Sequence, residues 1–291
     1  MLTSDRHMLD RVYVEIGNVC NMRCSFCPGT KRAPRQMSAD EFRLVCQKLS
    51  GYTENLLFHV MGDPLLHPDL GELLKIAGSY GYKVSITTNG SLFHRVGRVL
   101  RDNSDPIHRV SISLHAPEGN GRESELDSYL DSVIGFARSF SALDKNVVFR
   151  LWNLDADGRG GENTQNERIL ARLRSEYPGE WDKRYSGYRL AYRTFLELDG
   201  IFTWPVESSA EPKDEGRCHG LIRQIAILAE GTVVPCCLDS DGQIPLGNIF
   251  CEELGDILNS PLANSIREGF KKGIMAHSLC KKCTYARRFS K

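Results

Sequence analysis

Three cysteines lie close together near the start of this chain, in the stretch GNVCNMRCSFCPGTKR at residues 17–32. Cys20, Cys24 and Cys27 have the spacing C-x3-C-x2-C. Structural zinc sites close with four ligands, and neither a histidine nor a fourth cysteine lies nearby. Three thiolates on a short loop suit a cubic [4Fe-4S] cluster in which the protein holds three irons and the fourth iron takes another ligand.

A second group of cysteines lies in the C-terminal part of the chain and offers four thiols: Cys218, Cys236, Cys280 and Cys283. The stretch 224–235 reads as a β-hairpin that turns at Gly231, and this turn would bring the two flanking cysteines together. Ser260 and Pro261 then predict the cap and the first residue of a helix that leads to the terminal C-x-x-C pair. Four thiolates close either a second iron–sulfur cluster or a zinc site, and the sequence leaves both open.

The composition limits what the chain binds. Lysine plus arginine and aspartate plus glutamate number 37 each, so no broad electrostatic field attracts nucleic acid or an anionic membrane. No apolar stretch is long enough for a signal peptide or for the roughly 18 residues of a membrane span. We therefore expect a cytoplasmic protein without a membrane partner, for which nucleic acid is a disfavoured partner and in which the cysteines stay reduced.

Between the two cysteine groups, β-branched runs alternate with helix-like stretches. The expected strands are 12–16, 55–60, 83–87, 109–114, 147–151 and 194–198. The expected helices are 39–49, 69–80, 126–140 and 165–177, the first with a capping box made by Ser38 and Glu41. This alternation predicts an α/β protein of parallel βα units, six of which would close part way into a (β/α)6 TIM-like barrel.

In such a barrel the loops after the strands share one rim, where the chemistry takes place. The first of these loops carries the three cysteines, and the later ones carry polar or glycine-rich residues. The residues expected to bind a small polar substrate there are Glu15, His59, His115 and Glu197. The polar segment 155–166 is expected to be either a lid or a solvated loop.

The cysteine spacing, the Pro28-Gly29 pair that follows it and its place after a first strand resemble the signature of the radical S-adenosylmethionine superfamily. The resemblance implies that Cys20, Cys24 and Cys27 hold a catalytic [4Fe-4S] cluster whose open iron binds S-adenosylmethionine. It also implies reductive cleavage of that molecule to a 5′-deoxyadenosyl radical, which takes hydrogen from an unactivated C–H bond. A flavodoxin or a ferredoxin is then the expected electron donor.

The same resemblance implies contacts to S-adenosylmethionine from the loops after the later strands. The sequence MGDP at 61–64 resembles the family's Gly-Gly-Glu-Pro loop, with Met61 in place of its first glycine and Asp63 in place of its glutamate. The sequence TTNG at 87–90 resembles the end of the family's third strand. The residues expected to contact S-adenosylmethionine are Gly62, Asp63, Pro64, Thr88, Asn89, Ser113, Arg150 and Asn153.

The C-terminal cysteines resemble those of the twitch domain, a shortened form of the SPASM domain that binds an auxiliary [4Fe-4S] cluster. Because no cysteine follows Cys283, we expect one auxiliary cluster. The expected domains are a radical S-adenosylmethionine core at 1–205 and an auxiliary domain at 206–291. Cys237 and Cys251 are surplus to the four ligands and are interpreted either as inert thiols or as hydrogen-atom donors to a substrate radical.

Three classes of radical enzyme remain open at this point. The short segment before the first strand and the balanced charge favour an oxidoreductase or lyase that acts on a small polar molecule. The alternatives are a peptide maturase and a nucleobase- or tRNA-modifying enzyme, such as a 7-deazaguanine lyase similar to the queuine lyases. A zinc-ribbon binding module is the non-enzymatic alternative, and it does not explain a first site with only three ligands.

Overall fold

The computed structural model of the chain describes residues 8–154, 165–200, 202–206 and 208–289. The chain forms two compact units. Unit 1 comprises the residues up to 20, residues 28–84 and those from 202 onward, and unit 2 comprises residues 21–27 and 85–201. Most of the segment that the sequence offered as a lid, residues 155–164, lies outside the described residues, and its last residue, Asn166, begins a helix.

Unit 1 combines parallel strands from the first part of the chain with a hairpin from its C-terminal part. Its strands are β1 (Arg11–Val14), β2 (Asn55–Phe58), β9 (Gln224–Ile227), β10 (Thr232–Val234) and β11 (Gly247–Asn248). Its helices are α1 (Ala39–Leu49), α2 (Leu70–Ser79), α6 (Leu254–Leu258), α7 (Pro261–Lys271) and α8 (Ser278–Lys281), with the 3-10 helices η1 (Pro64–Leu66) and η4 (Tyr285–Phe289).

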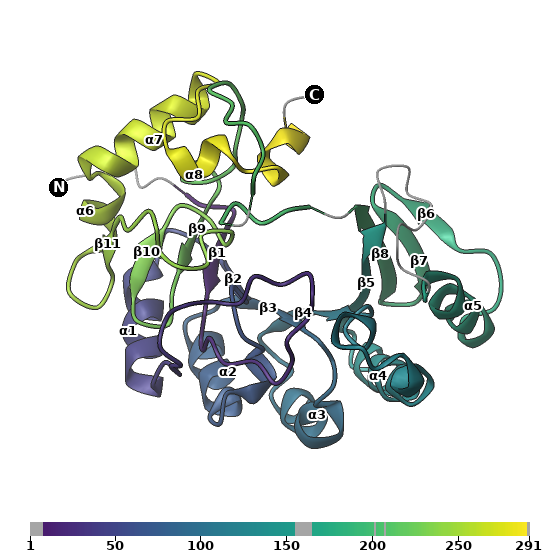
Figure 1. Cartoon of the computed structure of the whole chain (residues 1–291). Helices are drawn as coiled ribbons and strands as arrows, with labels where there is room; N and C mark the ends of the chain where they lie inside the picture. Colours follow the sequence, from purple (N-terminus) through teal and green to yellow (C-terminus); the bar gives the residue numbers. More distant parts are fainter. Residues whose placement is uncertain (1–7, 155–164, 201, 207, 290–291) are drawn as a thin grey trace. The chain divides into compact units, whose positions relative to one another are not determined.

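Strand β1 is the centre of the unit 1 sheet (Figure 1). It pairs in parallel with β2 on one side and with β9 on the other, so that Tyr13 lies opposite both Leu57 and Ala226. The chain turns from β9 into antiparallel β10 at Gly231, whose φ of 86° favours glycine. A Cβ atom there would also lie 2.6 Å from Asn248 Oδ1. The predicted hairpin is confirmed, and it pairs beside the strand that precedes the three cysteines.

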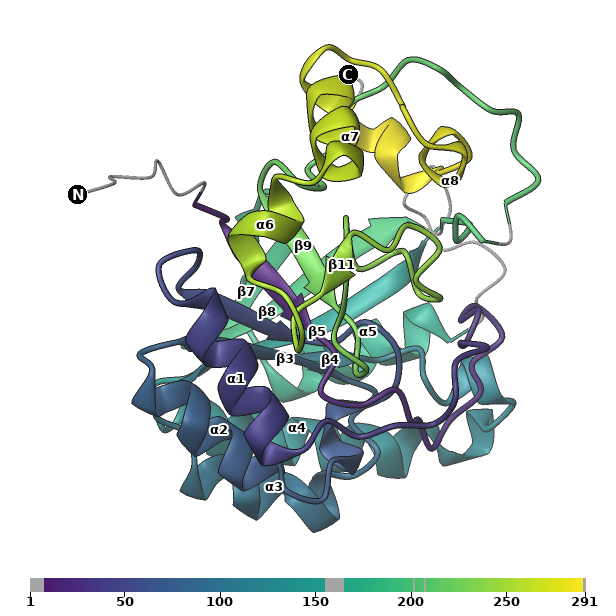
Figure 2. The same ribbon diagram turned by 90° about the vertical axis from the view of Figure 1, so that its left-hand side faces the viewer.

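Helices α1 and α2 lie side by side in unit 1 (Figure 2). The capping box predicted for α1 is present, with Glu41 N donating to Ser38 Oγ and Ser38 N donating to the Glu41 carboxylate. Phe42 packs edge-on against Phe58 of β2, with ring centroids 5.5 Å apart. Both rings are fully buried, and burial of each contributes about 1.5–3 kcal/mol to folding.

Unit 2 contains a second sheet segment with its own helices. Its strands are β4 (Ile107–Ser113), β5 (Asn146–Leu154), β6 (Asp182–Arg184), β7 (Gly187–Ala191) and β8 (Thr194–Gly200). Its helices are α3 (Phe93–Asp102), α4 (Leu126–Ser141) and α5 (Asn166–Glu176), with η2 (Glu118–Asn120) and η3 (Glu123–Glu125). Strand β3 (Lys83–Thr88) runs from unit 1 into unit 2.

Strand β5 holds the unit 2 sheet together. It pairs in parallel with β4 and β8, and this register places Arg150 opposite both Ser113 and Glu197. The antiparallel pair β6–β7 extends the sheet beyond β8. On the helical side, Phe93 of α3 stacks on Phe136 of α4 with ring centroids 3.8 Å apart.

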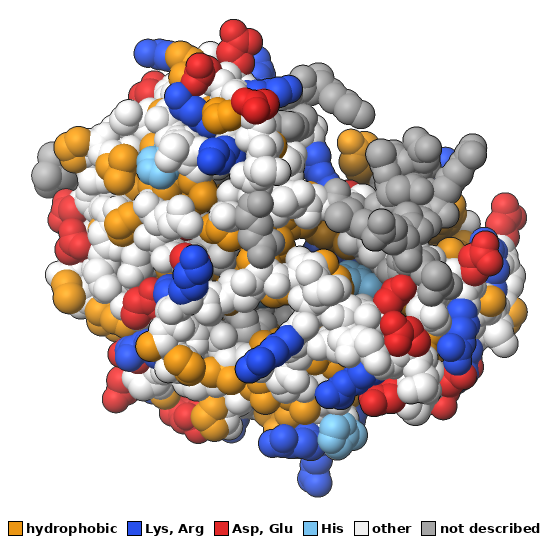
Figure 3. Space-filling view, in the orientation of Figure 1, with side chains coloured by type: hydrophobic (Ala, Val, Ile, Leu, Met, Phe, Trp, Pro, Cys, Tyr) orange, Lys and Arg blue, Asp and Glu red, His pale blue; other side chains and the backbone are white. Residues whose placement is uncertain are grey.

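The six predicted strands and four predicted helices are all present, within a few residues of their expected bounds. Helix α3 was not predicted, because its buried residues Phe93, Gly97 and Leu100 are separated by arginines and one of them is glycine. Among the described residues, no helix combines the length and apolarity needed to cross a membrane. On the face shown in Figure 3, basic side chains are interspersed with acidic ones, in keeping with the balanced charge.

Candidate active site and auxiliary cysteine site

The three N-terminal cysteines lie on the loop of residues 17–32, called the cluster loop below, which follows β1. Cys27 N donates a hydrogen bond to Cys24 O at 3.0 Å, which makes a tight turn between these two cysteines. Cys20 and Cys27 are exposed, and Cys24 is half-buried. All ten cysteines lie within the described residues, and none of them forms a disulfide there. Three reduced thiols on a short exposed loop fit the donor set that a three-ligand iron–sulfur cluster requires.

Asn120 of η2 holds the middle of the cluster loop in unit 2. Its Nδ2 donates to Cys24 Sγ at 3.1 Å and to Ala116 O at 2.8 Å, and its Oδ1 accepts from Arg23 N at 2.8 Å. Ser25 N donates to the neighbouring Gly119 O at 2.8 Å. Sequence reasoning missed Asn120 because nothing in its local pattern marks it, although it orients a cysteine that the pattern did mark.

We expect Asn120→Ala to lower the reduction potential of an iron–sulfur cluster held at Cys24. The substitution removes an N–H···S hydrogen bond, and such bonds raise the potential of a cluster because they stabilise its more negative reduced state. The measurement is a redox titration of the cluster followed by electron paramagnetic resonance. Asn103→Ala is the matched control, because Asn103 Nδ2 donates to Val99 O at the C-terminal end of helix α3. An unchanged potential in Asn120→Ala would show that this bond does not tune the cluster.

The loop after β2 packs against the start of the cluster loop in unit 1. Asp63 N donates to Val19 O at 2.9 Å, and Asp63 Oδ1 caps η1 by accepting from Leu65 N at 2.9 Å. Gly62 has a φ of 76°, and a Cβ atom there would lie 2.6 Å from Gly17 O. The glycine is therefore required for the close approach of the two loops, and the Asp63 carboxylate stabilises the turn that Pro64 begins.

The end of β3 is tied to the cluster loop within unit 2. Asn89 Nδ2 donates to Asn21 Oδ1 at 3.0 Å, and Asn21 Nδ2 donates to Ser91 Oγ at 2.9 Å. Thr88 Oγ1 accepts from Gly90 N at 3.0 Å. The side chains of Thr88 and Asn89 thus shape the turn beside the cysteines, and their predicted contact with S-adenosylmethionine stays a prediction.

A group of polar side chains lies on the neighbouring strands β4, β5 and β8 in unit 2. Glu197 contacts Arg109 at 3.1 Å and Arg150 at 4.0 Å, and its side chain is 23% exposed. The Arg150 guanidinium lies 3.5 Å from the centroid of the Trp152 ring, which gives a cation–π contact. The structure therefore brings two predicted site residues, Arg150 and Glu197, together with the Ser113 backbone that the sheet register places beside them.

His115 and Asn153 are buried next to this group. Burial, and then the charge of Arg150, lower the pKa of His115 to about 4, so the ring is neutral at pH 7. The His115 ring packs edge-on against Phe26 of the cluster loop, with centroids 4.4 Å apart. Neither amide atom of Asn153 has a hydrogen-bond partner among the described residues. A buried amide of this kind is costly unless a ligand or water pairs with it.

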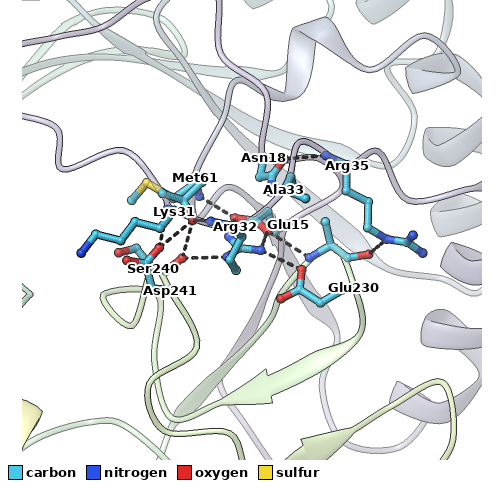
Figure 4. Close-up of polar contacts among 12 residues, drawn as sticks. Glu15, Asn18, Lys31, Arg32, Ala33, Arg35, Met61, Glu230, Ser240 and Asp241 are labelled. Atoms are coloured by element: carbon cyan, nitrogen blue, oxygen red, sulfur yellow. Dashed lines mark hydrogen bonds and ion pairs between the residues drawn. The ribbon is translucent and has the colours of Figure 1, made fainter.

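The two remaining predicted substrate residues lie in unit 1. His59 follows β2, and its ring packs edge-on against Tyr13 with centroids 4.9 Å apart. Glu15 follows β1 and is buried, and both of its carboxylate oxygens accept hydrogen bonds from Arg32 (Figure 4). These contacts favour a positioning role for Glu15, and the sequence had treated it only as a substrate ligand.

The four C-terminal cysteines line one cavity in unit 1: Cys218, Cys236, Cys280 and Cys283. The hairpin β9–β10 brings Cys218 and Cys236 together, because Cys218 precedes β9 and Cys236 follows β10. Helix α7 begins at Pro261 with the predicted cap, since Ser260 Oγ accepts from Ala263 N. It is followed by α8, which carries Cys280. The C-x-x-C pair itself forms a turn in which Cys283 N donates to Cys280 O at 3.1 Å.

The environment of these four thiols suits a cationic group. Burial and the neighbouring thiols raise the pKa of Cys236 and Cys280 well above the usual range, and burial raises the pKa of Cys218 to about 11. A bound metal centre stabilises thiolates in such a place. Within the described residues, no group of three or more His, Cys, Asp or Glu side chains is arranged to hold a single metal ion. A cubic cluster takes one cysteine at each iron.

The three other cysteines occupy separate places. Cys46 is fully buried in α1. Cys237 packs against the buried cluster around Tyr13 and shares a hydrogen bond with its hydroxyl group, and burial followed by this neighbour raises the pKa of Tyr13. Cys251 is exposed. The proposed hydrogen-donor role of Cys237 and Cys251 stays a prediction.

The fold and the cysteine sites define an α/β iron–sulfur protein with a three-cysteine loop after its first strand and a four-cysteine site near its C-terminus. Comparison with known families agrees. The radical SAM superfamily matches residues 14–143, and an iron–sulfur cluster-binding domain, SPASM, matches residues 218–284. The chain therefore carries a radical SAM domain and a C-terminal SPASM domain, as predicted. These two domains imply [4Fe-4S] clusters and S-adenosylmethionine as cofactors.

Curated relatives match only part of the chain. The probable GTP 3′,8-cyclase of Methanothermobacter marburgensis is 29% identical over 112 residues, which are 38% of this chain and 36% of that protein. The GTP 3′,8-cyclase of Acidothermus cellulolyticus is 29% identical over 162 residues, which are 50% of this chain and 44% of that protein. The chain thus spans less than half the length of each of these two relatives.

Solved structures are similar over nearly the whole chain. BtrN in complex with AdoMet and 2-DOIA is 20% identical with a TM-score of 0.60, and the match covers 95% of this chain and 93% of BtrN. Streptococcus suis SuiB bound to S-adenosylmethionine is 15% identical with a TM-score of 0.63, and the match covers 98% of this chain and 75% of SuiB. These likenesses confirm the predicted α/β class and the partial TIM-like barrel.

Proposed function

We propose that this chain is a radical SAM enzyme that reductively cleaves S-adenosylmethionine and abstracts hydrogen from a small polar molecule. In this proposal Cys20, Cys24 and Cys27 hold the catalytic cluster, and the four C-terminal cysteines hold one auxiliary cluster. When bound, the clusters supply single electrons, and S-adenosylmethionine supplies a 5′-deoxyadenosyl radical. Residues 1–205 then form the catalytic core and residues 206–291 the auxiliary domain, with a flavodoxin or ferredoxin as electron donor.

The observation that carries this proposal is the group of polar side chains on β4, β5 and β8. His115 contacts Phe26 between two cluster cysteines, so this group lies beside the place where a radical would form. Arg150 and Glu197 carry opposite charges, and His115 is neutral at pH 7 because burial lowers its pKa to about 4. A neutral ring, a paired arginine and a carboxylate suit directed hydrogen bonds to hydroxyl or amino groups.

The residues proposed to contact S-adenosylmethionine are those that the sequence motifs identified. They are Gly62, Asp63, Pro64, Thr88, Asn89, Ser113, Arg150 and Asn153. Asn153 is the strongest of these, because its buried amide has no partner among the described residues and would pair with a polar ligand.

The test is to follow hydrogen from substrate to cofactor. Anaerobic protein is incubated with dithionite, S-adenosylmethionine and perdeuterated aminocyclitols or amino sugars, and deuterium in 5′-deoxyadenosine is measured by mass spectrometry. We expect deuterium transfer from a member of this substrate class. Transfer from a deuterated peptide or nucleotide, and from none of these small molecules, would contradict the proposal.

A peptide maturase is the second candidate, because SuiB, which has been solved in complex with a precursor peptide, shares the fold with a TM-score of 0.60 in that complex.

The names of the curated relatives also suggest a nucleotide as the substrate. A triphosphate favours several unpaired cations, whereas the two arginines of the unit 2 polar group, Arg109 and Arg150, share Glu197. Iron, sulfide and zinc analysis of anaerobic protein separates all these enzymes from a zinc-ribbon module.

A further inference from the structure

Arg32 lies five residues after Cys27 and joins the cluster loop to the C-terminal hairpin region (Figure 4). Its guanidinium forms a two-pronged pair with Glu15, at 2.7 and 2.8 Å, and contacts Glu230 at 2.8 Å. Its Nε donates to Ser240 O at 3.0 Å. The Arg32 side chain is 12% exposed and that of Glu15 is fully buried. The network therefore belongs to the packed interior of the fold.

Glu15 accepts more hydrogen bonds than those from Arg32. Its Oε1 accepts from Met61 N at 3.0 Å and its Oε2 accepts from Ala229 N at 3.0 Å. Burial lowers the pKa of Arg32, but the hydrogen bonds and charges of Glu15 and Glu230 outweigh it and raise the pKa overall. Arg32 and Glu15 therefore form a fully satisfied buried ion pair between the end of β1, the loop after β2 and the hairpin turn.

Asp241 makes a second link to the same stretch of the cluster loop. Its Oδ1 accepts from Thr30 Oγ1 at 2.7 Å and from Lys31 N at 2.9 Å. Thr30 Oγ1 also lies 3.3 Å from Ser240 O. Residues 30–32 are thus held by two adjacent residues of the C-terminal region. Ser240 contributes its backbone carbonyl, and Asp241 contributes its carboxylate.

The segment that contains Ser240 and Asp241 is itself held in place by hydrogen bonds. It begins a few residues after the auxiliary ligand Cys236. Asp239 is buried, and its carboxylate accepts from Gln243 N at 2.7 Å and from Ile244 N at 2.8 Å. Because these bonds close a local turn, the segment keeps its shape through its own hydrogen bonds as well as through any group bound at the auxiliary cysteines.

We propose that Arg32 and Asp241 are positioning residues through which the C-terminal region fixes the cluster loop just after Cys27. The proposal rests on the proposed function, since it assigns these residues to the retention of the first cluster. An exposed loop with only three thiolate ligands has no fourth cysteine to keep the cluster in place. Contacts from the hairpin region, which also provides Cys236, order the cluster loop instead.

The test uses the full chain in a background in which Cys280 and Cys283 are alanine, so that the iron bound reports the first cluster. Asp241→Ala removes both carboxylate contacts, and Asp241→Asn keeps an oxygen that accepts them. Lys31→Ala is the matched control, because Lys31 is exposed and contributes its backbone N–H rather than its side chain. Iron release to a chelator is measured under anaerobic conditions, together with the electron paramagnetic resonance spectrum of the reduced cluster.

We expect Asp241→Ala to release iron about tenfold faster, as is typical when an outer-shell contact to a metal site is lost, and to broaden the spectrum. Asp241→Asn and Lys31→Ala should match the background protein. Arg32→Lys keeps the charge beside Glu15 but not the paired geometry, and it should also release iron faster. If Asp241→Ala matches Lys31→Ala in both readouts, the proposal is wrong. Absence of S-adenosylmethionine cleavage in the unsubstituted protein would instead overturn the proposed function and leave this comparison intact.

Discussion

Cys24→Ala should abolish S-adenosylmethionine cleavage by the dithionite-reduced protein. The cluster loop offers three thiols, and a cluster with one open iron uses all of them. Removal of Cys24 leaves two ligands and also removes the sulfur that Asn120 Nδ2 contacts at 3.1 Å. We therefore expect loss of the first cluster and no 5′-deoxyadenosine above background, measured by liquid chromatography with mass spectrometry. Cys20→Ala and Cys27→Ala should behave in the same way.

Cys251→Ala is the matched control for this experiment. Cys251 is exposed and lies apart from the four cysteines that line the auxiliary cavity. Its removal should leave both iron content and S-adenosylmethionine cleavage unchanged. Thermal unfolding of each variant separates loss of the cluster from loss of the fold. Cleavage that survives in Cys24→Ala would mean that the cluster loop is not the catalytic site.

Joint replacement of Cys280 and Cys283 by alanine should leave S-adenosylmethionine cleavage intact while product formation is lost. These two cysteines line the cavity shared with Cys218 and Cys236. Abstraction of one hydrogen atom leaves a substrate radical, and completion of a two-electron oxidation requires a second electron and a proton to leave. A cluster held by the four C-terminal cysteines would supply an acceptor for that electron.

The measurement compares 5′-deoxyadenosine and oxidised product from one reaction. In the unsubstituted protein the two should form in equal amounts, because one S-adenosylmethionine is consumed in each turnover. In the double variant 5′-deoxyadenosine should accumulate without product. Equal yields from both proteins would show that the auxiliary site does not take part in the reaction.

The parts of the fold that the sequence predicted are those in which local signals and global structure agree. Ser38 and Glu41 marked the start of α1, and Gly231 marked the turn between β9 and β10, because each satisfies a backbone requirement that only a few residue types meet. The cysteine spacing was equally local. It predicted the ligands of both sites, and the structure gathers the four C-terminal cysteines around one cavity.

What the sequence did not reveal depends on contacts between distant residues. Asn120 lies 96 positions from Cys24, and Asp241 lies 211 positions from Thr30. No periodicity or spacing marks such pairs, since the sheet topology alone brings them together. The β6–β7 pair was also missed, because the Asp182–Arg184 strand is exposed and shows no apolar alternation.

Glu15 illustrates how an expected substrate ligand acquires another role in the folded chain. The sequence placed it at the end of the first strand, where a carboxylate suits binding of a polar molecule. The structure surrounds it with Arg32 and two backbone N–H donors, and leaves it buried. Its partner could not be identified from the sequence, because several arginines follow the cysteines and only the fold selects Arg32.

The most direct test of this account is one measurement on anaerobically prepared protein. Iron and sulfide are quantified, and S-adenosylmethionine is then added to the dithionite-reduced protein while 5′-deoxyadenosine and the electron paramagnetic resonance spectrum are followed. We predict two [4Fe-4S] clusters per chain, a spectrum that changes when S-adenosylmethionine binds, and formation of 5′-deoxyadenosine. Zinc in place of iron at the cluster loop, or iron-loaded protein that forms no 5′-deoxyadenosine, would contradict it.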